Sequence, residues 1–244
     1  YKDYVLMILF IKYLSDKESD EDSIFTIPDG CRFSDFVLLK GDDHIGEQIN
    51  KKLEAIKEAN AMFLNRLALP NFNDPSKLGK PKEMRETLSN LIAAFESEDL
   101  DFSKNRTADD DILGDAYEYL MKNFAAESGK SKGQFYTPAE VSRVMAKMLH
   151  LTEFTSPSTT IYDPTCGSGS LLLRAIGETP NGATPYGQEK DNSTASLAIL
   201  NMLLHGVDTA TIEQGDTINS PEFTEGGQLK TFDVCVANPP FSTK

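Results

Sequence analysis

Short segments with strand character alternate with helical segments from Gln134 to the end of the sequence. The predicted strands are 160–162, 184–188, 210–214 and 232–237, and the predicted helices are 169–177, 192–205 and one that begins near Pro138. This alternation is typical of a parallel sheet, because parallel neighbours are joined by crossover helices. The pattern therefore predicts an α/β fold with four core strands, whose carboxyl ends lie at one edge of the sheet.

The first half of the chain has helical periodicity instead. Val5–Ile11 is apolar but much shorter than the ~20 residues that cross a bilayer, so it predicts a buried helix. Two stripes at helical spacing follow, comprising Ile45, Ile49, Leu53, Ile56 and Phe63, and then Met84, Leu88, Ile92 and Phe95. Such stripes are the buried faces of amphipathic helices.

The segments between these helices are predicted from their turn residues. The proline-containing segment 71–81 is expected to be a loop, and 20–43 to be irregular or a small hairpin. A last stripe, Ile112, Ala116, Tyr117, Leu120 and Phe124, predicts one more helix before a connector at 128–133. We therefore expect a helical domain over 1–125 and an α/β domain over 126–244.

Composition limits the class of protein. The three cysteines, Cys31, Cys166 and Cys235, are odd in number and lack the spacing of metal ligands, so a reducing, cytoplasmic setting is expected. No bound metal and no membrane association are predicted. The formal net charge of −14 argues against autonomous binding of duplex DNA, because phosphate contacts from basic residues supply most non-specific affinity.

Asn238-Pro239-Pro240-Phe241 follows the apolar run 232–237, at the carboxyl edge of the predicted sheet. Ligands bind at this edge in open α/β folds. The Asn238 side-chain oxygen and the Pro239 carbonyl could accept the two hydrogens of an exocyclic amine, and Phe241 could stack on the attached ring. Alternatively, the two prolines merely end a strand and open a loop.

A glycine-rich turn lies between the strand 160–162 and the helix 169–177. Glycines allow backbone N–H groups to approach a ligand and direct it to a helix N-terminus. A dinucleotide-binding turn requires a third glycine where this chain has Leu172, and a P-loop requires a lysine that is absent. Asp163, just before the turn, would repel a pyrophosphate but suits a positively charged amine. The turn therefore favours S-adenosylmethionine over NAD or ATP.

The segment Asp163-Pro164-Thr165-Cys166-Gly167-Ser168-Gly169-Ser170, followed by Asn238-Pro239-Pro240-Phe241, resembles the DNA N6-adenine methyltransferases. Together with Gly133-Gln134-Phe135-Tyr136-Thr137-Pro138 and the helical N-terminal region, it most resembles the modification subunit of type I restriction–modification systems. The resemblance implies a Rossmann-like, S-adenosylmethionine-dependent methyltransferase sheet. Such a sheet usually has seven strands, so the four predicted here suggest that the C-terminal strands are missing.

The resemblance also implies a role for individual residues. The implied catalytic residues, which would hold a flipped adenine, are Asn238, Pro239, Pro240 and Phe241. The implied cofactor-binding residues are Tyr136, Thr137, Pro138, Asp163, Thr165, Gly167, Ser168, Gly169, Glu189 and Asp216. Glu189 would hold the ribose and Asp216 the adenine amine, whereas Thr137 would lie near the methionine carboxylate. The alternatives are a solvated Glu189, a turn-forming Asp216 and a Thr137 that only caps a helix.

The resemblance finally implies partners. A specificity subunit would read the DNA sequence and a restriction subunit would complete the complex, which reconciles the acidic charge with duplex DNA as substrate. Two other functions remain open at this point. The same motif occurs in enzymes that methylate protein glutamine or RNA bases, and the chain could also be a non-catalytic scaffold that binds the cofactor and a partner.

Overall fold

A computed structural model describes residues 1–18, 23–97, 100–102, 119–120, 137, 139–153 and 156–239. The chain forms two compact units. One unit comprises Tyr1–Asn65 and Leu69–Ala116, and the other comprises Arg66–Ala68 and Tyr117–Lys244. The predicted boundary between 125 and 126 lies outside the described residues and stays a prediction, as do the connector at 128–133 and most of the helix predicted around Ile112.

The first unit is helical, and its first helix is buried nearly all round. α1 (Lys2–Lys17) buries Tyr4, Leu14 and the whole run Leu6–Ile11. A helix that is apolar on every face is stable only inside a core, and this one confirms the buried helix predicted at Val5–Ile11. Within the described residues, no helix is long and apolar enough to span a membrane.

Two amphipathic helices complete most of this core. α3 (Ile45–Ala59) buries Ile45, Ile49, Leu53 and Ile56, and α6 (Pro81–Ala94) buries Met84, Leu88 and Ile92. The two helices pack against each other, so both predicted stripes are confirmed as core faces except at Phe63, which is half-buried and lies beyond the end of α3. Pro81 occupies the first turn of α6, where its missing N–H costs nothing, and the Lys80 N–H donates to Glu83 Oε2 at 2.9 Å.

Three short helices were not predicted as separate elements. Two lie in segments that were expected to be irregular or a loop, and one lies at the end of a stripe that was assigned to a single helix. α2 (Phe33–Val37) lies where a small hairpin was one expectation, and that expectation is wrong. α4 (Ala61–Leu64) directly follows α3 and contains Phe63. α5 (Pro75–Leu78) lies within the predicted loop 71–81, because Asp74 accepts a hydrogen bond from the Ser76 N–H and so caps a single turn.

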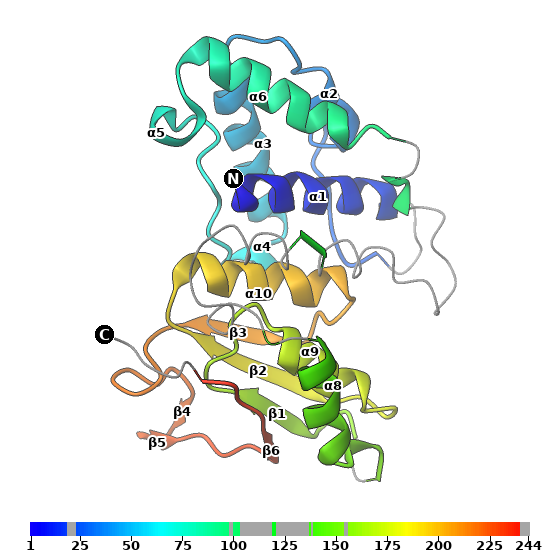
Figure 1. Ribbon diagram of the computed structural model, residues 1–244, viewed down its shortest axis with the longest axis vertical. Helices are drawn as coiled ribbons and strands as arrows, with labels where there is room; N and C mark the ends of the chain where they lie inside the picture. The colour runs from blue at the N-terminus through cyan, green and yellow to red at the C-terminus, as the bar shows by residue number, and fades with distance from the viewer. Residues whose placement is uncertain are drawn as a thin grey trace. The chain divides into compact units, whose positions relative to one another are not determined.

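The second unit contains a four-stranded parallel sheet in the order β3-β2-β1-β6 (Figure 1). Its strands are β1 (Thr160–Asp163), β2 (Thr184–Glu189), β3 (Thr211–Gln214) and β6 (Val234–Cys235). The four core strands and their parallel pairing confirm the predicted α/β fold. β1 lies in the centre, so the segments that follow β1, β2 and β6 emerge at the same edge.

Helices connect these strands as predicted. α9 (Ser170–Gly177) joins β1 to β2, and α10 (Asn192–Leu204) joins β2 to β3. α9 packs on β1 and β2, α10 packs on β2 and β3, and α8 (Ala139–Met148) packs on α9. A 3-10 turn, η3 (Leu151–Glu153), follows α8.

The orientation of α8 differs from the sequence pattern. The sequence places Val141, Val144, Met145 and Met148 at helical spacing, which predicts one apolar, buried face, but Val141, Val144 and Met148 are 46, 58 and 74% exposed. The buried positions are Ser142 and Ala146, both at 0%. Small side chains at these two positions allow α8 to approach α9 closely, and this contact determines which face is covered.

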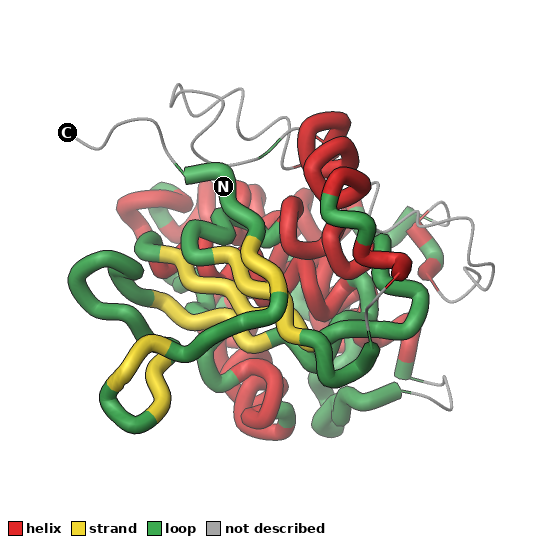
Figure 2. Tube along the Cα trace, turned by 90° about the horizontal axis from the view of Figure 1, so that it is seen from below, coloured by secondary structure: helices red, strands yellow, loops and turns green. Residues whose placement is uncertain are grey.

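An antiparallel hairpin, β4 (Thr224–Glu225) and β5 (Gln228–Leu229), lies apart from the sheet (Figure 2). The sequence did not predict it. Aromatic side chains anchor it: Phe232 stacks on Tyr162 of β1 with ring centroids 4.4 Å apart, and Phe223 meets Tyr162 and Tyr186 edge to face at 5.5 and 5.4 Å. Phe232 therefore contributes to this cluster rather than to β6, which is shorter than the predicted strand 232–237.

Candidate functional site

The glycine-rich turn connects β1 to α9 and has the backbone that its glycines permit. Gly167 has φ 56° and Gly169 has φ 80°, both in the left-handed region that side chains with a Cβ rarely occupy. Gly169 is the residue that precedes α9. A Cβ at Gly169 would lie 2.9 Å from Met202 Cε of α10, and the end of this flexible side chain could shift, so the backbone conformation is the main reason for glycine there.

α10 supports this turn through a buried side chain. Asn201, which is 2% exposed, donates from Nδ2 to the Ser168 carbonyl at 3.0 Å. Ser168 Oγ in turn lies 3.0 Å from Ser170 Oγ. The sequence analysis did not identify Asn201. The available signal was a carboxamide inside the otherwise apolar run Leu197–Leu204, because a buried polar group requires a specific partner.

Two predicted carboxylates converge on the turn. Glu189, at the end of β2, accepts from the Gly167 N–H at 3.1 Å through Oε2 and from the Asp191 N–H at 2.8 Å through Oε1. Asp163 is 1% exposed and accepts from the Thr165 N–H at 3.0 Å. Burial raises the pKa of Asp163 to about 7, and repulsion from Glu189 adds to this effect. A cation beside Asp163 would therefore be stabilised.

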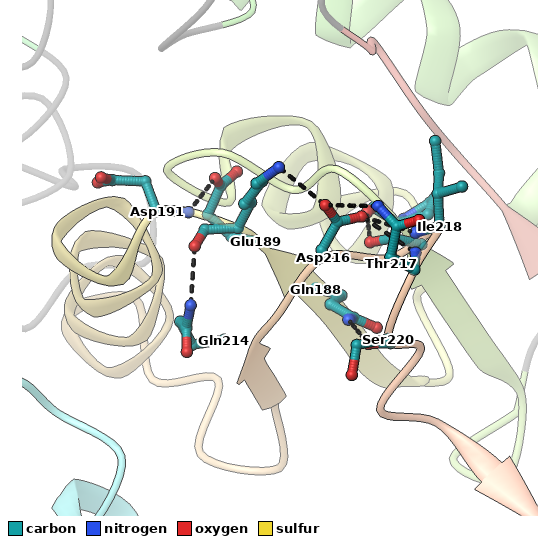
Figure 3. A network of polar contacts seen from close by, with 11 residues as sticks. Gln188, Glu189, Asp191, Gln214, Asp216, Thr217, Ile218 and Ser220 are labelled. Atoms are coloured by element: carbon teal, nitrogen blue, oxygen red, sulfur yellow. Dashed lines mark hydrogen bonds and ion pairs between the residues drawn. The ribbon is translucent and has the colours of Figure 1, made fainter. Parts of the chain in front are cut away.

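Asp216 follows β3 and is surrounded by hydrogen-bond donors (Figure 3). Oδ1 accepts from the backbone N–H groups of Ile218 and Asn219, both at 3.1 Å. Oδ2 accepts from Lys190 Nζ at 2.8 Å and from Asn219 Nδ2 at 3.1 Å. The Lys190 ammonium, followed by the Asn219 donors, holds the pKa of Asp216 far below its ordinary value.

Asn238 and Thr137 are brought together although they are 101 residues apart. Asn238 Nδ2 donates to Thr137 Oγ1 at 3.1 Å. The described part of α8 begins at Ala139, and residue 138 lies outside the described residues, so the helix-capping role of Thr137 stays a prediction. Pro239 is exposed, whereas Tyr136, Pro138, Pro240 and Phe241 lie outside the described residues.

The strand pairing places Asn238 at the same sheet edge as the glycine turn. β6 pairs with β1 in the register Ile161↔Val234 and Tyr162↔Cys235, and the Val236 N–H donates to the Tyr162 carbonyl at 2.9 Å. Asp163 is the last residue of β1, and Asn238 is the first polar residue after the neighbouring parallel strand β6. The predicted proximity of the two motifs follows directly from this register.

The residues at this edge fit an organic ligand that carries polar and cationic groups. Thr165 Oγ1 is buried with no hydrogen bond of full geometry, although it lies close enough to the Asp163 carboxyl to lower the pKa of that group, so a ligand that offers it a better hydrogen bond would be favoured. Thr165 lies two residues after Asp163, and Gly167 of the same turn is half-buried. Among the described residues, no group of three or more His, Cys, Asp or Glu side chains is placed to hold a metal ion.

Comparison with known proteins identifies relatives for both units. The N-6 DNA Methylase family matches residues 108–244, and the HsdM N-terminal domain matches residues 1–95. The type I restriction enzyme MpnII methylase subunit of Mycoplasma pneumoniae is 36% identical over 178 residues, which cover 68% of this chain and 32% of that protein. The MjaVIII methylase subunit of Methanocaldococcus jannaschii is 37% identical over 207 residues, covering 81% of this chain and 32% of that protein.

A solved structure agrees with these relatives. The type I restriction–modification system methyltransferase subunit from Streptococcus thermophilus superposes with a TM-score of 0.82 at 28% identity, covering all of this chain and 59% of that one. The chain spans about a third of the length of the curated relatives it matches. Because the family match includes the glycine turn, both carboxylates and Asn238, the chain belongs to the N-6 DNA methylase family.

Proposed function

We propose that this chain is the N-terminal and cofactor-binding part of a DNA methyltransferase subunit that transfers a methyl group from S-adenosylmethionine to N6 of adenine in duplex DNA. The parallel pairing of β1 with β6 is the observation that carries the proposal. It puts a cation-compatible turn and an amine-binding asparagine at one edge of the sheet. Family membership supports the same reaction.

Cofactor binding is assigned to the residues that surround the glycine turn. The buried Asp163 would face the cationic part of the ligand, and Thr165 Oγ1 would gain a hydrogen bond of full geometry. Glu189, already oriented by the Gly167 and Asp191 N–H groups, would accept from ribose hydroxyls. When bound, S-adenosylmethionine supplies a methyl group on a sulfonium centre, which can be transferred without a metal ion.

Asn238 is assigned the main role toward the target base. Its Nδ2 donates to Thr137 Oγ1, so the amide is oriented and its Oδ1 is the group that can accept from the N6 amine. The Pro239 carbonyl would accept the second hydrogen. These two hydrogen bonds would keep the lone pair localised on N6, rather than delocalised into the purine ring, and would fix its direction. Phe241 would stack on the base, which must first be rotated out of the duplex.

Partners follow from charge and from the relatives. A net charge of −14 makes this chain a poor duplex binder by itself. We therefore propose that a specificity subunit holds the target sequence, that a restriction subunit joins the same complex, and that the assembly works in the cytoplasm. The relatives that support this are methylase subunits of type I restriction enzymes.

The experiment is Asn238→Ala in the full-length protein, purified with its specificity subunit. We expect S-adenosylmethionine affinity within about twofold of wild type, because Asp163 and Glu189, the carboxylates assigned to the cofactor, are held by backbone N–H groups of Thr165, Gly167 and Asp191. Methyl transfer to unmethylated duplex DNA should fall by about 100-fold or more, since misplacing a reacting group costs roughly this factor. Asn181→Ala is the matched control, because Asn181 is exposed in the loop before β2 at the opposite edge. Near-normal methylation by the Asn238→Ala complex would contradict the proposal.

A further inference from the structure

The carboxylate of Asp216 has no acceptor position left over for a ligand. A carboxylate offers about four lone-pair sites. Four donors occupy them: the Ile218 and Asn219 N–H groups on Oδ1, and Lys190 Nζ and Asn219 Nδ2 on Oδ2 (Figure 3). An amine that binds Asp216 must therefore displace one of these donors.

The four donors differ in how easily they can leave. The Ile218 and Asn219 N–H groups belong to the turn that Asp216 itself initiates, so their release would require the turn to open. Asn219 Nδ2 belongs to a short side chain of the same turn, so it too cannot move far from Asp216. Lys190 is different, because its long side chain comes from the end of β2 and is 74% exposed.

The backbone of Lys190 is held in place while its side chain is free to swing. Glu189 pairs with Gln214 in the β2–β3 register, and Gln214 Nε2 donates to the Lys190 carbonyl at 2.8 Å. The Lys190 Cα therefore stays fixed when the ammonium leaves Asp216. Exposed ion pairs of this kind add little stability and are screened by salt, so Lys190 is the donor that is displaced at the lowest cost.

We propose that Lys190 gates the adenine end of the cofactor site, because its ammonium must leave Asp216 before the 6-amino group of the cofactor can bind there. This inference rests on the proposed function, which places an adenosine-containing cofactor at this edge. The gate lowers the affinity for 6-aminopurine ligands specifically. Ligands without a donor at position 6 do not need Asp216 and are unaffected.

The size of the effect follows from the population of the open state. If an exposed pair is closed about one to five times as often as it is open, the apparent affinity for a competing ligand is reduced about two- to sixfold. Lys190→Met removes the ammonium and keeps most of the apolar stem. It should therefore tighten binding of S-adenosylhomocysteine about two- to sixfold at low salt, and added salt should reduce the difference.

The test is calorimetric titration of the full-length protein with S-adenosylhomocysteine and with its analogue that carries unsubstituted purine. Lys190→Met should tighten only the first ligand, and Lys190→Gln should do the same. Lys147→Met is the matched control, since it removes an exposed ion pair with Glu178 at the far end of α9 from the glycine turn. This control should bind both ligands like the wild type.

Three results would overturn the gate. Weaker binding of S-adenosylhomocysteine by Lys190→Met would mean that Lys190 only positions Asp216. Equal tightening of both ligands would indicate a general charge effect. Unchanged affinity for both would show that Lys190 is not displaced, although the proposed function would stand. If the wild type bound neither ligand, the proposed function would fail and the gate with it.

Discussion

Asp163→Asn should alter the pH dependence of stability in a direction opposite to that of most carboxylates. Asp163 is buried, and its pKa is raised from about 3.9 in an unfolded chain to about 7 in the folded one. The folded state therefore binds the proton more tightly between these values. The free energy of unfolding consequently falls as pH rises from about 4 to about 7. Asparagine cannot ionise, so the free energy of unfolding of the variant does not fall with rising pH for this reason.

The magnitude follows from the two pKa values. Between pH 5 and pH 8, a carboxyl group with a folded pKa of about 7 costs the wild type about 2.5 kcal/mol of unfolding free energy. Asparagine can still accept from the Thr165 N–H, but its amide hydrogens require new partners. That cost does not change with pH. It therefore cancels in a double difference: the free energy of unfolding of the variant minus that of the wild type is measured at pH 8 and at pH 5, and the second value is subtracted from the first.

Urea unfolding followed by circular dichroism at pH 5 and pH 8 measures this double difference. We expect about +2.5 kcal/mol for Asp163→Asn. Asp233→Asn is the control, because Asp233 accepts from the Thr160 N–H and hydroxyl and its pKa is lowered. Its contribution is lost only as pH falls below about 3.9, so its double difference should be near zero. A double difference below about 0.5 kcal/mol for Asp163→Asn would refute the argument from burial.

Two further predictions concern the support of the site. Gly187→Ala would place a Cβ 2.7 Å from Ile212 Cδ1 and should destabilise the protein by about 1–3 kcal/mol. The control is Gly177→Ala, which has nothing within 4 Å of its Cβ and should be neutral or slightly stabilising. Both variants are measured in the same urea titrations. Asn201→Ala leaves the Ser168 carbonyl without its donor and should lower the free energy of unfolding by about 1–3 kcal/mol. It should also weaken binding of S-adenosylhomocysteine in calorimetry. Unchanged stability and affinity would show that α10 does not support the turn.

The parts of the fold that the sequence predicted well are those where local pattern and tertiary burial agree. The strands β1, β2 and β3 are short segments that alternate with helical segments, and the structure ends each within one residue of its predicted bounds. α3 and α6 have apolar side chains at helical spacing, and these became the core. In such segments the burial of apolar surface and the backbone preference favour the same conformation.

The predictions failed where distant contacts decide the outcome. The apolar stripe of α8 is exposed because Ser142 and Ala146 pack inward, and no periodicity within one helix specifies its neighbour. Phe223 and Phe232 pack on tyrosines that precede them by tens of residues, so the hairpin between them has no strong local signal. The same applies to the site: the family motif predicts Asp216, but the donors that surround it come from two separate loops.

Three residues of the N-terminal half are built into the second unit. Arg66 pairs with Glu213 of β3 at 2.7 Å, the Ala68 N–H donates to Ser196 Oγ of α10 at 2.9 Å, and Leu67 between them is 1% exposed. The sheet and α10 can therefore form all their native contacts only when a peptide translated more than a hundred residues earlier is available. A fragment that begins after Ala68 would lack the contacts of Arg66–Ala68 with α10 and β3, so limited truncation from the N-terminus should impair the α/β unit before it reaches the glycine turn or Asn238.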